Sequence, residues 1–247
     1  MSLFNKFFGK QRLLKEAAKI PVKTDIHSHL IPGIDDGSQS MEESIKLITE
    51  LKSLGYTKLI TTPHIMSDYF KNDHYTIGNG LRMLMQELNE RKIDIEIEAA
   101  SEYYIDEHFM KLIEKDELLW FGDKYVLVET NTINFNQYIR NAFFELGLAG
   151  YRPVLAHPER YTYMWNNFDR YYEFRDQGIL FQINLISLSG FYSQKVKEVA
   201  EKMIDENLVN FIGTDTHEMR YVDGLKQTLY NPYMLKLQEM NLLNDTL

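Results

Sequence analysis

Two histidines, His27 and His29, open the part of the sequence whose residue types could do chemistry. They end a short apolar run, "VKTDIHSHL", and a loop-like segment with two aspartates, "IPGIDDG", follows. Residues i and i+2 of a strand point to the same side, so both imidazoles can approach one cation. Asp215 and His217 repeat this spacing in "GTDTH", far along the chain. The two pairs predict a metal site.

Most histidines of the chain fall at the ends of predicted strands. Short runs rich in Val, Ile, Leu and Thr recur along the sequence, as is typical of strands buried on both faces. The seven runs cover residues 22–30, 56–64, 93–102, 125–130, 152–158, 179–187 and 208–216. Five of the seven histidines lie at the ends of such runs, and only His74 and His108 do not. This clustering favours a metal centre over scattered surface histidines.

Eight residues at these strand ends are candidate metal ligands. They are His27, His29, Asp36, His64, Glu102, His157, Asp215 and His217. Imidazole and carboxylate together suit zinc, manganese or iron, whereas calcium and magnesium prefer oxygen ligands alone. Because a catalytic zinc usually takes about three protein ligands, this set predicts two or three divalent ions. Spacing alone does not choose between Asp35 and Asp36.

The segments between the runs are predicted to be helices. The best marked begins after Ser40, where Glu43 three residues later indicates a capping box, and it ends at Gly55. Further helices are expected near residues 81–91, 136–146, 168–177, 194–206 and 227–240, and the segment between the third and fourth runs is less regular. Repeated strand–helix units predict right-handed crossovers and a parallel sheet. Seven units favour one closed barrel, with an open doubly wound sheet as the alternative.

The composition argues against several classes of protein. A formal net charge of −9 disfavours a nucleic-acid-binding surface, which is usually basic. No apolar run reaches the ~18 residues of a membrane-spanning helix. The chain has no cysteine, which excludes thiolate zinc sites and a cysteinyl-phosphate intermediate. The absence of cysteine fits a reducing compartment, and we expect a cytoplasmic protein.

The first twenty residues differ from the rest of the chain. They hold five Lys or Arg and one Glu, with apolar residues interspersed. We therefore divide the chain into a basic amphipathic extension, residues 1–20, and a single domain, residues 21–247. The extension is expected to be a helix packed on the domain. Weak contact with an acidic membrane surface or with a partner is the alternative.

The motifs resemble the PHP (polymerase and histidinol phosphatase) superfamily. The matching segments are "DIHSHLIPGIDDGSQSMEES", "TPH", "SEYY", "AHPERY" and "GTDTH", which lie between residues 25 and 217. Within the superfamily the chain is similar to bacterial protein-tyrosine phosphatases of capsule and exopolysaccharide synthesis, the CpsB type. This resemblance implies an α/β fold, a distorted TIM-like barrel of seven β/α units with its metal site at the C-terminal ends of the strands.

The resemblance also implies how three ions would be held. The implied groups are His27, His29, Glu102 and Asp215 for the first ion, Glu102 and His157 for the second, and Asp36, His64 and His217 for the third. Glu102 would bridge two ions, and the second ion would need water or substrate to complete its coordination. The resemblance favours Asp36 over Asp35, which would then shape the turn.

Hydrolysis of a phosphate ester is the reaction that such a site suits. Bound metal lowers the pKa of water to around 7, and paired ions can stabilise the attacking and leaving oxygens. Arg160 follows His157 by three residues and could bind the phosphoryl group with its forked guanidinium; the alternative is a surface ion pair with Glu159. Arg220 follows His217 at the same spacing and could act likewise.

The implied substrate is a phosphotyrosine protein, such as the tyrosine-rich tail of a bacterial tyrosine kinase that controls polysaccharide export. Several aromatic residues could flank the phosphotyrosine ring without an assigned role: Tyr103, Tyr104, Tyr161, Tyr163, Phe191 and Tyr192. A small-molecule phosphatase, for example one for histidinol phosphate, is the alternative. A phosphodiesterase or exonuclease is disfavoured by the acidic charge. A non-catalytic, metal-stabilised adaptor is the remaining hypothesis.

Overall fold

The computed structural model describes residues 13–247. Its strands are β1 (Thr24–Asp25), β2 (Lys58–Thr61), β3 (His64–Ile65), β4 (Glu96–Ala99), β5 (Glu102–Tyr104), β6 (Tyr125–Glu129), β7 (Arg152–Ala156), β8 (Leu180–Asn184) and β9 (Phe211–Gly213). Its α-helices are α1 (Met41–Leu54), α2 (His74–Glu90), α3 (Glu107–Glu114), α4 (Ile139–Leu148), α5 (Asp169–Asp176), α6 (Gln194–Asp205), α7 (Met219–Thr228) and α8 (Tyr233–Glu239).

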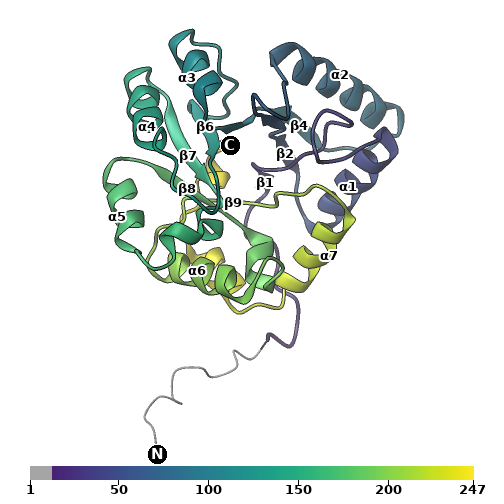
Figure 1. Cartoon of the computed structure of the whole chain (residues 1–247). Coiled ribbons are helices and arrows are strands. Elements are labelled where there is room, and N and C mark those ends of the chain that lie inside the picture. The colour runs from purple at the N-terminus through teal and green to yellow at the C-terminus, as the bar shows by residue number, and fades with distance from the viewer. Residues whose placement is uncertain (1–12) are drawn as a thin grey trace, which may run out of the picture.

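The strands are parallel and form a ring inside the helices (Figure 1). One sheet has the order β1-β2-β4 and the other β3-β5-β6-β7-β8-β9. A parallel bridge between Ser28 and Thr216 joins the first strand segment to the last, with His29 N donating to Thr216 O at 3.0 Å and Asp215 N to His27 O at 2.7 Å. The expected distorted barrel is therefore present, and seven strand segments contribute to it.

Two predicted strands are each interrupted near their carboxyl ends. The run 56–64 divides into β2 and β3 at Thr62 and Pro63, where proline has no N–H for the ladder. The run 93–102 divides into β4 and β5, and Ser101 fills the break by donating its hydroxyl to Pro63 O at 2.7 Å. These breaks separate the two sheets. They also turn the following residues, His64 and Glu102, toward the same end of the ring.

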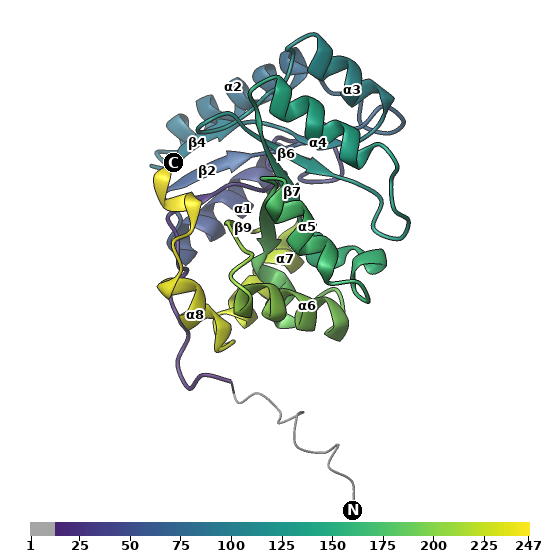
Figure 2. The same cartoon turned by 90° about the vertical axis from the view of Figure 1, so that its left-hand side faces the viewer.

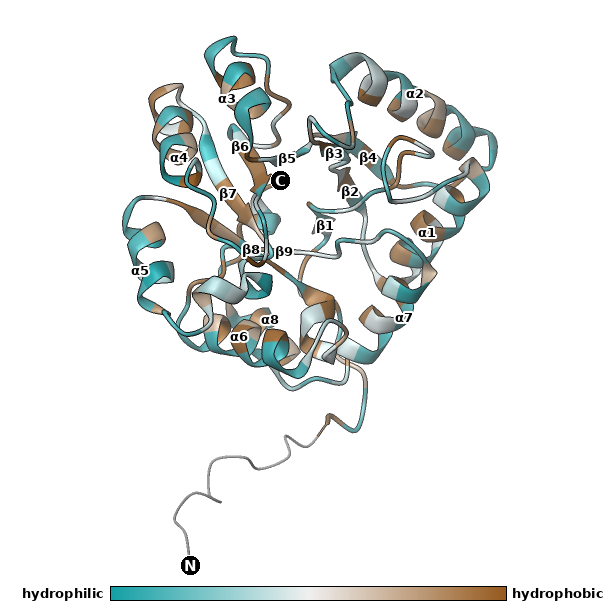
Figure 3. Ribbon diagram, in the orientation of Figure 1, coloured by the Kyte–Doolittle hydropathy of each residue, from teal (hydrophilic) through white to brown (hydrophobic). Residues whose placement is uncertain are grey.

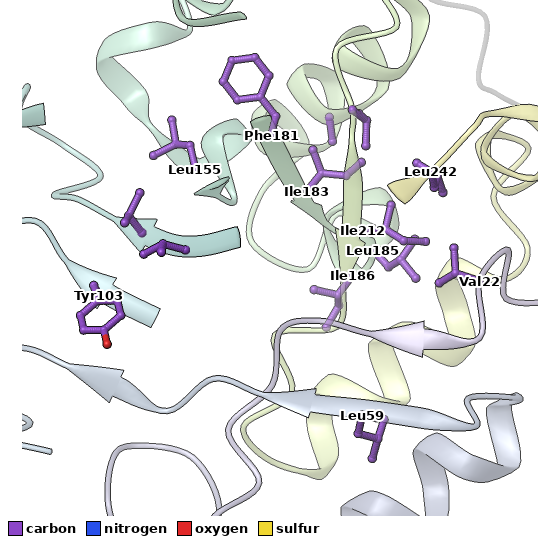
Figure 4. Packing of buried hydrophobic residues seen from close by; sticks show 14 of the residues in the cluster. Val22, Leu59, Tyr103, Leu155, Phe181, Ile183, Leu185, Ile186, Ile212 and Leu242 are labelled. Atoms are coloured by element: carbon purple, nitrogen blue, oxygen red, sulfur yellow. The ribbon is translucent and has the colours of Figure 1, made fainter. Parts of the chain in front are cut away.

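Alternate strand residues pack on opposite sides of the sheet, as the period of two requires. Leu59, Leu155 and Ile212 belong to the large cluster that the helices cover, part of which Figure 4 shows. Ile60 and Phe211 belong to a smaller cluster, which Leu243 and Leu247 from the C-terminal segment complete. Figure 3 shows β6 mainly in the colours of apolar residues and β1 in those of polar ones, and the helices carry both colours.

The C-terminal segment covers the end of the barrel at which the strands begin. Asn244 donates to Thr24 O at 3.0 Å and to Ile212 O at 2.8 Å, which ties β1 to β9. In Figure 2 this segment, in yellow, runs from α8 along one side of the molecule toward β2 and β4. The opposite end of the barrel, where the strands terminate, is left for the predicted ligands.

The helix predictions hold in outline and fail at two points. Helix α1 is capped by Ser40, whose hydroxyl accepts from Glu43 N at 3.2 Å, and it ends at Gly55 with a φ of 112°. The reciprocal half of the capping box is wrong, because the Glu43 carboxylate accepts from Gln39 N instead. The predicted helix 227–240 is wrong in its bounds: it overlaps only the last two residues of α7, which begins at Met219, and all of α8, and Pro232 lies between the two helices.

The expected N-terminal helix is wrong over residues 13–20, which are extended or bent. Leu14 N donates to Tyr230 O and Ala18 N to Leu229 O, both at 2.8 Å, so this segment lies along the end of α7. Residues 1–12, on which the rest of that expectation falls, lie outside the described residues. Among residues 13–247, no helix has the length and apolar character needed to cross a bilayer.

The contacts that close the barrel predict that substitution of Asp25 lowers the stability of the fold. Its buried carboxylate accepts from Thr214 N at 2.9 Å and from Thr214 Oγ1 at 2.7 Å, and burial raises its pKa to about 6. Asp25→Ala would leave Thr214 N without its acceptor and Thr214 Oγ1 with only the longer bond to His27 O, at 3.2 Å, so we expect a loss of about 1–3 kcal/mol in urea unfolding. Asp123→Ala, at an exposed acid, is the matched control and should change little. Equal stability of the two variants would contradict this account of closure.

Candidate metal centre

The structure brings all eight predicted ligand residues together at the end of the barrel where the strands terminate. Each follows, or lies within, the last residues of a strand segment, except Asp36 in the loop between β1 and α1. Together with Arg160 and Glu129 they surround a cavity of about 270 Å³, to which six of the eight contribute lining. His27 and His29 are fully buried beneath it.

The first candidate group consists of His27, His29, Glu102 and Asp215. His27 Nε2 lies 3.1 Å from Glu102 Oε2 and 3.3 Å from Asp215 Oδ1. His29 Nε2 lies 3.4 Å and 3.5 Å from the same two oxygens, and 3.4 Å from His27 Nε2. Ligands bound at about 2.0–2.2 Å in a tetrahedron are roughly 3.3–3.6 Å apart. The donor atoms therefore fit around one transition-metal ion.

The outer nitrogens of the two histidines are held by acceptors. His27 Nδ1 donates to Gln182 Oε1 and His29 Nδ1 to Asp35 Oδ2, each at 2.8 Å. These bonds place the proton on Nδ1 and leave the Nε2 lone pair of each ring facing the site. Asp35 also accepts from His64 N at 3.0 Å and from Gly37 N at 3.0 Å. It orients a candidate ligand as well as shaping the turn.

A second group lies nearer the opening and contains Asp36, His64 and His217, with His29 beside them. Asp36 Oδ1 is 3.4 Å from His64 Nε2 and 3.5 Å from His217 Nε2. His217 Nδ1 donates to Asp215 O at 2.8 Å, so the lone pair of its Nε2 is left to coordinate a metal ion. Asp36 is more exposed than the other members and approaches from the solvent side.

The third group contains a residue that sequence reasoning missed, Glu129. His64 Nδ1 is 3.3 Å from Glu102 Oε2 and 3.4 Å from Glu129 Oε1, yet it makes no hydrogen bond among the described residues. His157 Nε2 lies 3.0 Å from Glu102 Oε1 and 3.7 Å from Glu129 Oε2. Glu129 was detectable as the last residue but one of the fourth run, 125–130, at the same strand end as the other ligands.

The electrostatics of the cluster call for bound cations. Burial lowers the pKa of His27, but the nearby Glu102 and Asp215 outweigh it and raise that pKa to about 9. Desolvation and the Glu102 charge raise the pKa of Glu129 well above its usual range. Three carboxylates this close are stable only when positive charge lies between them. The residues present therefore fit divalent ions.

Two candidate ligands have left-handed backbone conformations. His157 has a φ of 35° and Asp215 a φ of 52°. Both are buried, whereas the other non-glycine residues with positive φ among residues 13–247 are exposed: Lys92, Asp116, Lys124 and Asn207. A buried strained residue persists only where surrounding contacts over-determine it, which is common at functional sites. Here both residues contribute donor atoms to the candidate groups.

Arg160 lies at the edge of the cavity and pairs with Asp215. Its Nη1 donates to Asp215 Oδ2 at 3.3 Å, and its guanidinium carbon is 4.6 Å from the centre of the Tyr192 ring. The alternative, a surface pair with Glu159, is wrong. Glu159 is fully buried and accepts from Asn184 N at 2.9 Å and from Ser187 Oγ at 2.7 Å.

Arg220 lies outside the cavity lining. Its Nε is 2.5 Å from Glu218 Oε1, and its side chain is 66% exposed. The guanidinium lies over the rings of Phe191 and Tyr221, at 5.7 Å and 5.6 Å. A role in phosphate binding would require this side chain to turn toward the site, and that role stays a prediction.

The aromatic residues that line the cavity are not those singled out in the sequence. Tyr103 and Tyr161 are fully buried in the large cluster. Phe70 and Tyr221 line the cavity instead, each stacked on a candidate ligand. The Phe70 ring lies 5.4 Å from that of His64, and the Tyr221 ring lies 5.2 Å from that of His217.

Known proteins of similar sequence come from several bacteria. CapC of Staphylococcus aureus is 30% identical over 213 residues, which cover 86% of this chain and 84% of CapC. YwqE of Bacillus subtilis, named a tyrosine-protein phosphatase, is 29% identical over 197 residues, which cover 79% of this chain and 78% of YwqE.

Two solved structures are similar in fold. One, from work on YwqE of Bacillus subtilis and CpsB of Streptococcus pneumoniae as metal-dependent tyrosine phosphatases, has a TM-score of 0.78 at 26% identity, covering 87% of this chain and 90% of that one. A histidinol phosphate phosphatase of Lactococcus lactis, with zinc, has a TM-score of 0.54 at 15% identity, covering 84% and 92%.

The family model described as capsular polysaccharide synthesis, CpsB/CapC, matches residues 23–223. That range contains every candidate ligand, from His27 to His217, together with Arg160 and Arg220. The chain therefore belongs to the CpsB/CapC family of capsular polysaccharide synthesis.

Proposed function

We propose that this chain is a metal-dependent protein-tyrosine phosphatase. One observation carries the proposal. Three buried or partly buried carboxylates, Glu102, Glu129 and Asp215, converge with five imidazoles on a cavity that has an arginine at its edge. A purely structural metal site would close its coordination, whereas this cluster opens to the cavity. Relatives with 29% identity named as tyrosine-protein phosphatases point to the same activity.

Two or three divalent ions, manganese, iron or zinc, would be held by the candidate groups. His27, His29, Glu102 and Asp215 would hold one, and Asp36, His64 and His217 another. Glu129 would join Glu102 and His157 at the remaining position, where it would be a third protein ligand. When bound, such ions lower the pKa of water and neutralise charge on a phosphoryl group.

The chain's own residues would bind and orient the phosphate ester. Among the described residues Arg160 uses only Nη1 in a hydrogen bond, so its other N–H groups remain for phosphoryl oxygens. The two oxygens of Asp215 have different partners: Oδ1 faces the histidines, and Oδ2 accepts from Asn184 at 2.7 Å. Water would replace the phenolate at phosphorus, which gives tyrosine and inorganic phosphate.

The proposed substrate is a phosphotyrosine protein, such as the tyrosine-rich tail of a kinase in polysaccharide export. Family membership supports this choice. Histidinol phosphate is the alternative, and a comparison of turnover with a phosphotyrosine peptide and with histidinol phosphate decides between them. Faster turnover of histidinol phosphate would reject the protein substrate.

Metal removal should abolish turnover, and Glu102→Gln should nearly do so. A neutral amide is a poor ligand between cations, so we expect at least a ~100-fold loss of turnover on an aryl phosphate, with metal content reduced. Glu98→Gln, at an exposed carboxylate of β4, is the matched control. Elemental analysis of the wild type should give two or three ions per chain. Full activity with fewer than two ions would reject the multinuclear site.

Metal affinity should rise with pH between about 6 and 9. In the metal-free protein the carboxylates raise the pKa of His27 to about 9, so at neutral pH a proton occupies the site and metal must displace it. Lower pH strengthens this competition, and activity should fall in mild acid together with metal content. Chelator competition at several pH values measures the slope. An affinity independent of pH would contradict the proposed coordination by histidine.

Arg160→Ala should lower turnover by about 10²–10³-fold if the guanidinium stabilises charge that develops in the transition state. Arg160→Lys should recover only part of the loss, because an ammonium cannot make two parallel hydrogen bonds. Metal content must be measured in the same samples, since Arg160 also contacts Asp215. Arg140→Ala, at an exposed pair with Glu173, is the control. Near-normal turnover of Arg160→Ala would remove this residue from the site.

A further inference from the structure

The lining of the metal cavity is divided into a charged part and an aromatic part. The charged part includes Glu102, Glu129, Arg160 and Asp215. The remaining apolar lining comes from Met66, Phe70 and Tyr221. A phosphate ester has the same division, because its phosphoryl group is anionic and its organic group is not.

The two aromatic rings stand beside the metal-binding group that is nearest the opening. Phe70 is stacked on His64 with an angle of 13° between the ring planes, and Tyr221 on His217 with an angle of 28°. The two imidazoles are 6.1 Å apart. Phe70 and Tyr221 therefore lie at the two ends of a row of rings that contains His64 and His217 and flanks the site beside Asp36.

Both rings are held in place by contacts that do not depend on a ligand. Met66 and Phe70 exchange two backbone hydrogen bonds, each of 2.9 Å, which close a tight turn. Tyr221 lies in the first turn of α7, and its ring also contacts that of Phe191 at 5.1 Å. Phe70 and Tyr221 nevertheless keep part of their surface exposed, which a purely structural role does not require.

We propose that Phe70 and Tyr221 form an aryl-binding wall that selects phosphate esters with a flat aromatic leaving group. The inference rests on the proposed phosphatase function and assigns its preference for aryl monoesters to these two residues. An aromatic group stacks on such rings at centre distances of about 4.5–7 Å, whereas a short alkyl group covers less of their surface. The wall orients the ester oxygen toward Asp36, His64 and His217, and the phosphoryl group toward Arg160.

Binding of two phosphonates that cannot be hydrolysed tests the wall without turnover. Calorimetry on the metal-loaded protein compares phenylphosphonate with methylphosphonate, which share the anionic group. The wild type should bind phenylphosphonate more tightly. Phe70→Leu and Tyr221→Leu should each reduce this preference by about threefold to tenfold. Tyr221→Phe keeps the ring and should keep the preference.

The matched control is Tyr69→Leu, because Tyr69 adjoins Phe70, is 73% exposed and does not line the cavity. It should leave the preference unchanged. Equal affinity of the wild type for the two phosphonates overturns the proposal, as does an unaltered preference in both leucine variants. Metal content, measured on every variant, excludes a lost site as the cause of a lowered preference.

Turnover in the same proteins separates the wall from the proposed function. The ratio of kcat/KM for a phosphotyrosine peptide to that for a phosphoserine peptide should fall in the leucine variants, and dividing by the wild-type ratio cancels the difference in leaving groups. A preference for phenylphosphonate without any turnover would support the aryl-binding wall and reject the phosphatase function. Turnover without a phenyl preference would support the phosphatase function and reject the aryl-binding wall.

Discussion

The buried carboxylate of Glu102 is the contact on which the rest of the site depends. Its oxygens lie within 3.0–3.4 Å of nitrogens on four histidines, His27, His29, His64 and His157. A fully buried carboxylate is costly unless cations or donors surround it. Four strand segments must therefore bring their ends to one point. The break between β4 and β5, which separates the two sheets, places Glu102 at that point.

A second layer of polar residues holds the inner ligands in position. Gln182 fixes His27 and Asp35 fixes His29, while Asn184 and Tyr192 both donate to Asp215 Oδ2, at 2.7 Å and 3.1 Å. None of these four residues is in the predicted set of eight ligands. Their hydrogen bonds fix the tautomers and ring orientations of the two histidines and the position of the Asp215 carboxylate. The fold therefore arranges the donor atoms before a cation binds.

The sequence predicted the parts of the site that depend on local spacing. The strand period of two pairs His27 with His29, and parallel strands share one carboxyl end, so the ligand rim followed directly. Glu129 was missed because no residue at the end of the fourth run, 125–130, was considered; that end has no histidine, and Glu129 is the last residue but one of the run. The orienting role of Asp35 was also out of reach, because it depends on how a loop folds back beneath His29.

Interruptions of regular structure were equally hard to predict. Pro63 marks the break before β3, but the run 93–102 gives no such sign of the break before β5, which depends on pairing with neighbouring segments. Pro232 did indicate the end of a helix, yet the apolar pattern on both sides of it read as one element. The extended segment 13–20 reflects docking on the end of α7, a tertiary contact that overrides the helical pattern.

Closure between β1 and the segment after β9 also constrains when the site can exist. The bond between Thr214 and Asp25 spans 189 residues of sequence, and two candidate ligands closely follow each of these two residues. Contacts of such separation form late, because the entropy of closing a long loop must be overcome before they contribute. During synthesis His27 and His29 emerge long before Asp215 and His217. A ribosome-bound chain thus passes through most of its translation before the first candidate group, His27, His29, Glu102 and Asp215, can be complete.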